Sequence, residues 1–245
     1  MIVGTFWQGS GLGNQLFRYV ATHVVAADLG TKFGMDNPEL FKGDFMNLDM
    51  GIAPQWLQHR FEEQRINNEQ GVDIRPYDPR VKDIKDHTRI DGEFQAEKYF
   101  EHRLDEVRSW LKVEELEVPE DVCVINFRGG EYVGVPDLFL PQEYWDTAIA
   151  YMKKINRNFR FKVVTDDIET ARKFFPRLEI THEIGADWRA IRYAHYLILS
   201  NSSFGILPAL LNQNAKVIIA PNFWAGRNVR YWKLPQNEYK SFTYL

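Results

Sequence analysis

Cysteine is almost absent from this chain of 245 residues, which contains only Cys123, inside the apolar run VCVINF. One cysteine excludes an intrachain disulfide, a CxxC redox pair and a cysteine-cluster zinc site. Its neighbours predict a buried thiol in a strand. The histidines also lack any partner motif, so we expect structural or surface roles for all of them: His23, His59, His87, His102, His182 and His195.

Several motifs of well-known enzyme classes are also missing. The chain has no Gly-x-Ser-x-Gly elbow and no Walker-type phosphate loop. It has no histidine–glutamate zinc spacing and no Asp-x-Asp at a predicted strand end; Asp91-Gly-Glu93 is the nearest approach. We therefore expect no metal.

Long apolar runs and a strong charge bias are absent too. No stretch approaches the roughly 18 apolar residues of a membrane-spanning helix, and no basic segment followed by an apolar run begins the chain. The net charge is -4 and the pI about 5.9, which argues against nucleic acid or an anionic membrane surface as the partner. We expect a soluble, cytoplasmic protein that binds small molecules.

The first conspicuous feature is a glycine-rich turn near the N-terminus. An apolar strand over residues 2–7 is followed by GSGLGNQLF and by a helical pattern that ends near residue 30. A dinucleotide fingerprint requires its third glycine where Asn14 stands, so the fingerprint fails. The glycines, Gly13 among them, instead predict a tight turn that brings Asn14 and Gln15 to a ligand; the alternative for Asn14 is that it caps the helix.

The chain divides into two predicted α/β halves. Residues 37–98 show no long period, and we expect irregular loops and short helices there, forming a variable surface. A helix follows over residues 97–113, and EELEVPED has the composition of a linker. We place the domains at 1–117 and 118–245, with the last residues allowed to pack back on the first domain.

The second half alternates strands and helices regularly, which predicts a doubly wound, mostly parallel sheet. Ligands of such sheets bind at the carboxyl ends of the strands. Three polar segments stand at those ends: NFRGGEY, TDD and SNSSF.

In the first of these segments, Arg128 precedes Gly129 and Gly130. A planar guanidinium can donate two parallel hydrogen bonds to a diphosphate, and glycines allow backbone amides to approach a ligand closely. The alternative is a surface arginine beside an ordinary turn.

The other two segments offer hydrogen-bonding groups. Ser202, Ser203 and Phe204 stand where the next helix begins, and a helix N-terminus attracts anions; the alternative is a plain serine N-cap. Pro208 suggests that this helix starts nearer Leu207. Asp166 and Asp167 can accept hydrogen bonds from guanine or ribose, whereas Asp167 also suits the N-cap of the following helix.

Four segments in this order resemble the α-1,2-fucosyltransferase family (glycosyltransferase family 11) and its α-1,6- and protein O-fucosyltransferase relatives. GSGLGNQLFRY is similar to the family's Gly-Gly-Leu-Gly-Asn-Gln-Leu/Met-Phe, and IDGEFQAEKYF to its Gly-Tyr-(Phe/Trp)-Gln-Ser-Glu-Lys-Tyr-Phe. VVTDDIE resembles Phe-Ser-Asp-Asp, and LILSNSSFGILPALLN resembles Ile-x-Ala-Asn-Ser-Ser-Phe-Ser-Trp-Trp-Gly-Ala. The resemblance covers most of the chain.

The resemblance implies a GT-B architecture, in which two Rossmann-like domains face each other across a cleft. It implies GDP-fucose as donor substrate, inversion at the anomeric carbon, no metal or other cofactor, and a glycan acceptor. The donor-binding residues would be Arg128, Gly129, Gly130, Asp166, Asp167, Asn201, Ser202, Ser203 and Phe204. The acceptor side would hold Gly13, Asn14 and Gln15.

The chain departs from the family at the arginine motif His-x-Arg-Arg-Gly-Asp-Tyr. Its histidine is Asn126 here, its second arginine Gly129 and its aspartate Glu131, while Ile206-Leu207 replaces the paired tryptophans. For catalysis we name Arg128, Glu131 and Asn14; Glu131 is either a carboxylate base or a salt-bridge partner of Arg128. A transferase of another nucleotide-sugar and a binding relative without turnover remain alternatives.

Overall fold

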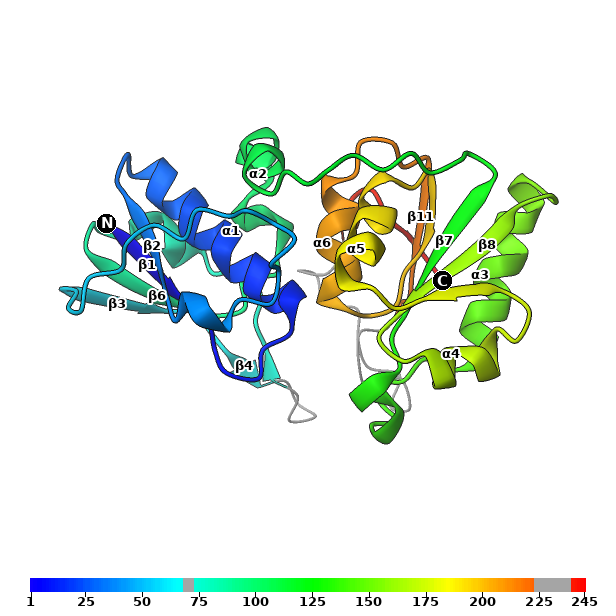
Figure 1. Cartoon of the computed structure of the whole chain (residues 1–245). Helices are drawn as coiled ribbons and strands as arrows, with labels where there is room; N and C mark the ends of the chain where they lie inside the picture. Colours follow the sequence, from blue (N-terminus) through cyan, green and yellow to red (C-terminus); the bar gives the residue numbers. More distant parts are fainter. Residues whose placement is uncertain (68–72, 223–238) are drawn as a thin grey trace. The chain divides into compact units, whose positions relative to one another are not determined.

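The computed structural model describes residues 1–67, 73–222 and 239–245 (Figure 1). The described residues form two compact units, and the boundary between the units falls between Lys112 and Val113 of the sequence. Residues 223–238, which belong to the predicted domain 118–245, lie outside the described residues. Each unit contains its own parallel sheet, so the predicted mixed α/β fold is confirmed.

The first unit contains a four-stranded parallel sheet in the order β2-β1-β6-β3. Its helices and strands are β1 (Ile2–Thr5), α1 (Leu12–Asp28), β2 (Phe33–Asp36), η1 (Pro38–Leu40), β3 (His59–Glu62), β4 (Ile66–Asn67), β5 (Asp73–Ile74), η2 (Pro79–Asp83), β6 (Thr88–Asp91), η3 (Glu97–Tyr99), η4 (Glu101–Arg103) and α2 (Leu104–Trp110). Strands β4 and β5 form a separate antiparallel pair.

Helix α1 follows the predicted apolar spacing and ends where the sequence indicates. Its buried face includes Leu16, Val20 and Val24, which recur every four residues. The helix ends at Asp28, and Gly30, two residues later, has a φ of 61°, the left-handed conformation that commonly follows the end of a helix.

The expectation of irregular structure over residues 37–98 is wrong for two segments. Strands β3 and β6 lie in the parallel sheet, and β6 pairs with β1 as well as with β3. Strand β6 has only four residues, TRID, which alternate buried and half-buried. An alternation over only four residues is hard to distinguish from a loop in the sequence, and the pairing of this strand is set by tertiary contacts.

The helix predicted over residues 97–113 is shorter in the structure. Two 3₁₀ turns, η3 and η4, precede α2, which spans only seven residues.

The second unit contains a six-stranded, entirely parallel sheet in the order β12-β11-β10-β7-β8-β9. Its helices and strands are β7 (Val122–Phe127), η5 (Gly130–Gly134), α3 (Gln142–Ile155), β8 (Arg160–Thr165), α4 (Ile168–Phe174), β9 (Glu179–Thr181), α5 (Ile184–Tyr193), β10 (Tyr196–Ile198), α6 (Ser203–Leu211), β11 (Val217–Ala220) and β12 (Thr243–Tyr244).

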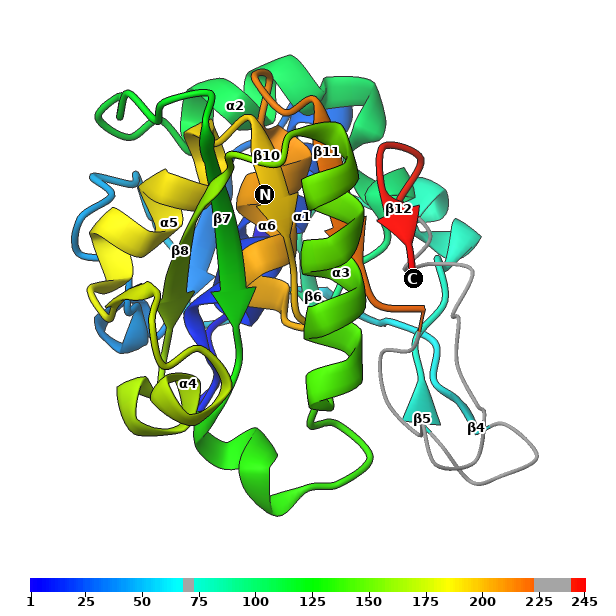
Figure 2. The same cartoon turned by 90° about the vertical axis from the view of Figure 1, so that its right-hand side faces the viewer.

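Helices cover both faces of this sheet: α3 lies on one face, and α5 and α6 lie on the other (Figures 1 and 2). The central strand β7 is buried along its whole length, as expected for a parallel strand covered on both faces. On the α3 side, Phe127 packs against Trp145 with ring centroids 5.3 Å apart. Burial of each such side chain contributes about 1.5–3 kcal/mol. The predicted burial of Cys123 is confirmed.

The start of one helix in the second unit differs from the sequence prediction. Helix α6 begins at Ser203, not near Leu207. It contains Pro208, which lacks an N–H, and this buried apolar helix tolerates the loss of that one internal hydrogen bond. Helix α5 is capped by Glu183, whose carboxylate accepts from the amides of residues 185 and 186. The last described strand, β12, pairs with β11 in the second unit's sheet.

His23 is the central side chain of an aromatic stack in the first unit. Its ring lies 3.7 Å from that of Trp110 and 4.0 Å from that of Phe33. Burial lowers the pKa of His23 to about 4, since the stack solvates an imidazolium poorly.

We expect acid to destabilise the first unit through His23. Between about pH 6.5 and 4 the unfolded chain binds a proton that the folded chain does not, so the free energy of unfolding falls as the pH falls. The loss should be roughly 1–2 kcal/mol, because the ring is partly exposed. Urea unfolding of His23→Phe at pH 7 and pH 4.5 should show a smaller acid loss than wild type. His59→Phe, at an exposed position, serves as control; equal losses in wild type and His23→Phe would contradict the prediction.

Gly205 allows α6 to approach β7. A Cβ atom at this position would lie 2.2 Å from Oδ1 of Asn126, which is buried and accepts a hydrogen bond from Oγ of Ser200 at 3.0 Å. The absence of a side chain at Gly205 is therefore a packing requirement.

Gly205→Ala should lower the free energy of unfolding by about 1–3 kcal/mol through overpacking. Gly134→Ala, where a Cβ meets no atom within 4 Å, is the matched control. In an Asn126→Ala background the cost of Gly205→Ala should shrink, since the clashing group is gone. The measurement is denaturant titration of wild type, Gly205→Ala, Asn126→Ala and the double variant. If Gly205→Ala cost the same free energy with and without Asn126→Ala, this contact would not be responsible.

Candidate functional site

The topology of the second unit creates a switch point beside β7. The chain proceeds from β7 to β8 and β9 on one side, then returns through α5 to place β10 on the other side of β7. Loops that leave the two neighbouring strands at such a point diverge and leave a crevice at the carboxyl edge. The loops after β7 and β10 are the segments that contain Arg128 and Asn201–Phe204.

Arg128 lies at the carboxyl end of β7 and is surrounded by acids. Its Nη1 lies 2.6 Å from Oδ2 of Asp166, and its Nη2 donates to Oε1 of Glu131 at 3.0 Å. Nε is buried and has no hydrogen-bond partner among the residues that the structure describes. The guanidinium is thus held in place and retains unused donor capacity.

The two glycines after Arg128 allow close contact with the β8 loop. The amide of Gly129 donates to Asp166 at 2.9 Å, and the amide of Gly130 donates to Asp167 at 3.2 Å. A Cβ at Gly129 would lie 2.7 Å from Cβ of Asp167. Gly130 has a φ of 42°, and a Cβ there would lie 2.5 Å from the Asp166 carboxylate. These two amides therefore bind protein carboxylates, an arrangement that the sequence did not indicate.

Asp167 caps helix α4, as its alternative interpretation predicts. Its Oδ1 accepts from the amide of Thr170 at 3.0 Å, and its Oδ2 accepts from the hydroxyl of Thr170 at 2.6 Å. These hydrogen bonds hold the pKa of Asp167 below its usual value. Asp166 is the more available of the two acids, because its only described partners belong to the Arg128 loop.

The loop after β10 leads into helix α6. Ser202 occupies the N-cap position, but its side chain makes no capping hydrogen bond. Asn201 is buried, and its amide donates to the carbonyl of Leu138 at 2.9 Å. Ser203 and Phe204 are half-buried in the first turn of α6. A first turn of this kind presents backbone amides to an anion.

Tyr132 connects the two loops and was not identified as a site residue from the sequence. Its hydroxyl donates to the carbonyl of Asn201 at 3.4 Å, and its ring centroid lies 5.2 Å from the Arg128 guanidinium carbon. Burial raises the pKa of Tyr132. The available signal was its place in the arginine motif, which ends in tyrosine.

The predicted acceptor-side residues lie at the carboxyl edge of the first unit. Oδ1 of Asn14 accepts from the side-chain amide of Gln95 at 3.1 Å, so Asn14 does not serve as the N-cap; Gly11 occupies that position. Gln15 is completely buried and hydrogen bonds to the backbone of Leu40 and Lys42. Its role in the structure is to hold that loop. Gly13 is buried in the first turn of α1.

Arg18, one turn after Asn14, was also not singled out from the sequence. Its guanidinium lies 3.5 Å from the ring centroid of Trp7 and donates to the carbonyl of Gly92 and to Oε1 of Glu93, both at 2.8 Å. The pKa of Arg18 is lowered by burial, which the nearby Glu93 carboxylate opposes. Glu93, its ion-pair partner, stands where the similar fucosyltransferase segment has a tyrosine, and this difference was the signal available in the sequence.

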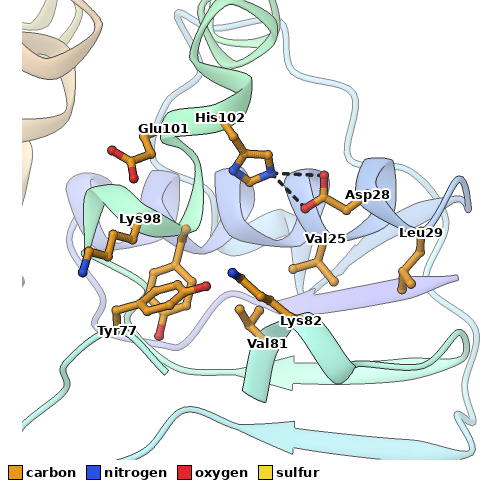
Figure 3. Close-up of a pocket in the computed structure, with 10 residues that line it drawn as sticks. Val25, Asp28, Leu29, Tyr77, Val81, Lys82, Lys98, Glu101 and His102 are labelled. Carbon is orange, nitrogen blue, oxygen red and sulfur yellow. Dashed lines mark hydrogen bonds and ion pairs between the residues drawn. The ribbon is translucent and has the colours of Figure 1, made fainter. Parts of the chain in front are cut away.

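A hollow of about 630 Å³ lies elsewhere in the first unit, at the C-terminal end of α1 (Figure 3). The imidazole of His102 there is held by the Asp28 carboxylate at 3.0 Å. None of the predicted site residues lines this hollow, which is formed by Val25, Asp28, Leu29, Tyr77, Val81, Lys82, Lys98, Tyr99, Glu101 and His102.

The described residues contain neither a cluster of metal-ligating side chains nor a helix that could span a membrane. No group of three or more histidine, cysteine, aspartate or glutamate side chains in residues 1–67, 73–222 and 239–245 is arranged to hold a metal ion. Among the helices of these same segments, none is both long and apolar enough to cross a membrane.

Comparisons with known proteins point to sugar transfer. No protein-family model matches the chain. It is 24% identical over 268 residues to an alpha-1,2-colitosyltransferase of Escherichia coli, which covers 89% of this chain and 90% of the relative. A solved structure, the glycosyl transferase family 9 protein of Veillonella parvula, superposes with a TM-score of 0.46 at 13% identity, covering 100% of this chain and 86% of that one. The similarity to the colitosyltransferase supports the predicted enzyme class, a glycosyltransferase.

Proposed function

We propose that this protein is a glycosyltransferase that moves a fucose-type sugar from a GDP donor to a sugar hydroxyl, with inversion and without a metal. The donor diphosphate binds the second unit at the crevice beside β7. Arg128 is the observation that carries this proposal: it is an arginine at a topological switch point, and its buried Nε has no hydrogen-bond partner in the segments that the structure describes.

The chemistry needs a group that stabilises the departing diphosphate. As the bond to the anomeric carbon breaks, negative charge accumulates on the phosphate oxygens. Arg128 and the first turn of α6 supply fixed positive charge and hydrogen-bond donors at this edge of the sheet. Stabilising the leaving group in this way lowers the barrier without a covalent intermediate.

The contacts of Arg128 fit this role. Its pair with Asp166 is partly buried, with both side chains 27% exposed, and fixes the orientation of the guanidinium. Its pair with Glu131 is different, because the Glu131 side chain is 76% exposed. An exposed pair contributes less than about 1 kcal/mol, so a diphosphate can displace Glu131 at little cost.

Fucose and colitose are the two candidate sugars. They differ at carbon 3, where colitose lacks a hydroxyl. The resemblance of the sequence segments favours fucose, whereas the Escherichia coli relative is named as a colitosyltransferase. Parallel assays with GDP-fucose and GDP-colitose decide between them.

Arg128→Ala should lower kcat/KM for the donor by about 10²–10³-fold, since one charge-stabilising donor group is lost. Arg128→Lys should retain part of the activity, because the charge remains but the two-pronged geometry does not. The measurement is the rate at which GDP is released from the donor in the presence of the acceptor.

The matched control is Arg160→Ala, which removes an arginine from the opposite end of the neighbouring strand β8. Arg160 is exposed and pairs with Asp121 at 2.7 Å, so its loss should leave turnover near wild type. If Arg128→Ala were as active as Arg160→Ala, the assignment of Arg128 to the phosphates would be wrong.

GDP should stabilise the protein against heat, whereas UDP and NAD should not. A ligand at 100 times its Kd adds about 2.7 kcal/mol to the free energy of unfolding. The shift in Tm should persist in Arg160→Ala and disappear in Arg128→Ala. A response to UDP instead of GDP would favour a different nucleotide-sugar, and nucleotide binding without turnover of any donor would favour the non-catalytic alternative.

A further inference from the structure

The first unit contains a hollow at the C-terminal end of α1 to which the proposed function assigns no role (Figure 3). We call it the α1 hollow. Its volume is about 630 Å³, within the range of about 300–1,000 Å³ that is typical of small-molecule sites. Val25 lines it and lies about 16 Å along the helix from Asn14, at a rise of about 1.5 Å per residue. The α1 hollow is therefore separate from the predicted acceptor-side residues.

One side of the α1 hollow is formed by Tyr77, whose ring packs against Tyr99. The two ring centroids lie 4.9 Å apart. Tyr99 is only 4% exposed and is fixed by its hydroxyl, which donates to the Glu63 carboxylate and accepts from the amide of Asp78, each at 2.9 Å. Tyr77 itself is half-buried. Its ring thus offers a fixed aromatic surface to a ligand.

The hydroxyl of Tyr77 is available for hydrogen bonding. It has no hydrogen-bond partner among the residues that the structure describes. Burial raises the pKa of Tyr77, so the hydroxyl stays protonated at neutral pH and can donate as well as accept. Val25, Leu29 and Val81 also line the hollow and add aliphatic surface. An aromatic ring, aliphatic side chains and a hydroxyl together suit a sugar ring, which has apolar C–H faces and a polar edge.

Two lysines that have no described partner line the same hollow. Lys82 belongs to η2 and Lys98 to η3, and both are exposed. The side chain of neither forms an ion pair or a hydrogen bond with another residue in the described part of the chain. Figure 3 draws their ammonium groups on either side of Tyr77. An unpaired ammonium group is a compact positive charge that attracts phosphate and carboxylate groups.

The acids of the α1 hollow do not cancel the two lysine charges. The Asp28 carboxylate is paired within the protein, 2.5 Å from Nε of Arg103 and 3.0 Å from Nε2 of His102 (Figure 3). Glu101 is the second acid of the lining and is exposed; a carboxylate there can accept hydrogen bonds from sugar hydroxyls. Because Arg103 balances Asp28, two lysines face one further carboxylate, and the hollow favours an anionic ligand.

We propose that the α1 hollow binds a negatively charged sugar, with Lys82 and Lys98 at the charged group and Tyr77 at the ring. The charged group is a phosphate on a sugar or the carboxylate of an acidic sugar, and both place a negative charge beside a hydroxylated ring. This site goes beyond the proposed function, since it uses neither Arg128 nor a nucleotide. The enzyme class, a glycosyltransferase, supports a sugar over other small anions.

The test is titration calorimetry of the full chain with glucose 1-phosphate, glucuronate and uncharged glucose. At least one of the two charged sugars should bind with a Kd of about 1 mM or tighter. Glucose should bind at least about tenfold more weakly, because it lacks the group that the lysines hold. The tighter of the two charged sugars identifies the phosphate or the carboxylate as the preferred group.

Variants of the lining assign the binding to the α1 hollow. Lys82→Ala and Lys98→Ala should each weaken binding of the charged sugar by at least about fivefold, the factor for one exposed charge pair at its strongest. Tyr77→Ala should weaken it as well, because the surface beneath the ring is lost. Lys85→Ala is the matched control: Lys85 is an exposed lysine of the same unit that does not line the hollow, so the affinity should stay within about twofold of wild type.

Arg128→Ala separates the α1 hollow from the proposed donor site. It should keep its affinity for the charged sugar while losing that for GDP. Loss of charged-sugar binding in Arg128→Ala, with retention in Lys82→Ala and Lys98→Ala, would overturn the proposal. Equal binding of glucose and the charged sugars to wild type, or binding of neither charged sugar, would also overturn it, whether or not GDP binds. Wild type that binds a charged sugar but not GDP would contradict the proposed function alone.

Discussion

Parallel pairing of β7 with both β8 and β10 is the constraint on which the second unit depends. The register places Phe127 opposite Thr165, and Ile125 opposite Ile198. Because all three strands run in the same direction, the residues that follow them emerge at one edge. The arginine, the two aspartates and the start of α6 meet there although they are far apart in sequence.

This meeting imposes steric demands that explain the glycines of the region. Gly129 and Gly130 lie against the carboxylates of Asp166 and Asp167, and Gly205 lies against Asn126. Each position lacks space for a methyl group, so the loops pack more closely than other residues would allow. Glycine at 129, where the fucosyltransferases that the sequence resembles have a second arginine, thus serves packing between two loops.

The two units differ in how their partly buried charged side chains are paired. In the second unit, Arg128 is paired with two carboxylates, and the exposed one, that of Glu131, can be displaced at little cost, which supports the proposal that an anion binds there. In the first unit, Glu93 pairs with Arg18 and lies near Arg75, while its buried Oε2 has no hydrogen-bond partner within the described part of the chain. Stabilisation of a leaving diphosphate, as proposed for Arg128, needs a site of the first kind.

The sequence alone determined the elements with strong periodic signals: α1, the alternation of strands and helices from β7 to β11, and Arg128 at a strand end. Its hydrophobic pattern and strand-end glycines are local properties, which is why they could be interpreted without a structure. Only the tertiary structure decided the rest. Strands β3 and β6 are too short to predict, Gln15 proved to be a buried loop anchor, and Glu93 acquired its arginine partners through contacts between distant segments. The chemistry of a carboxylate depends on what surrounds it, and those surroundings exist only after the chain has folded.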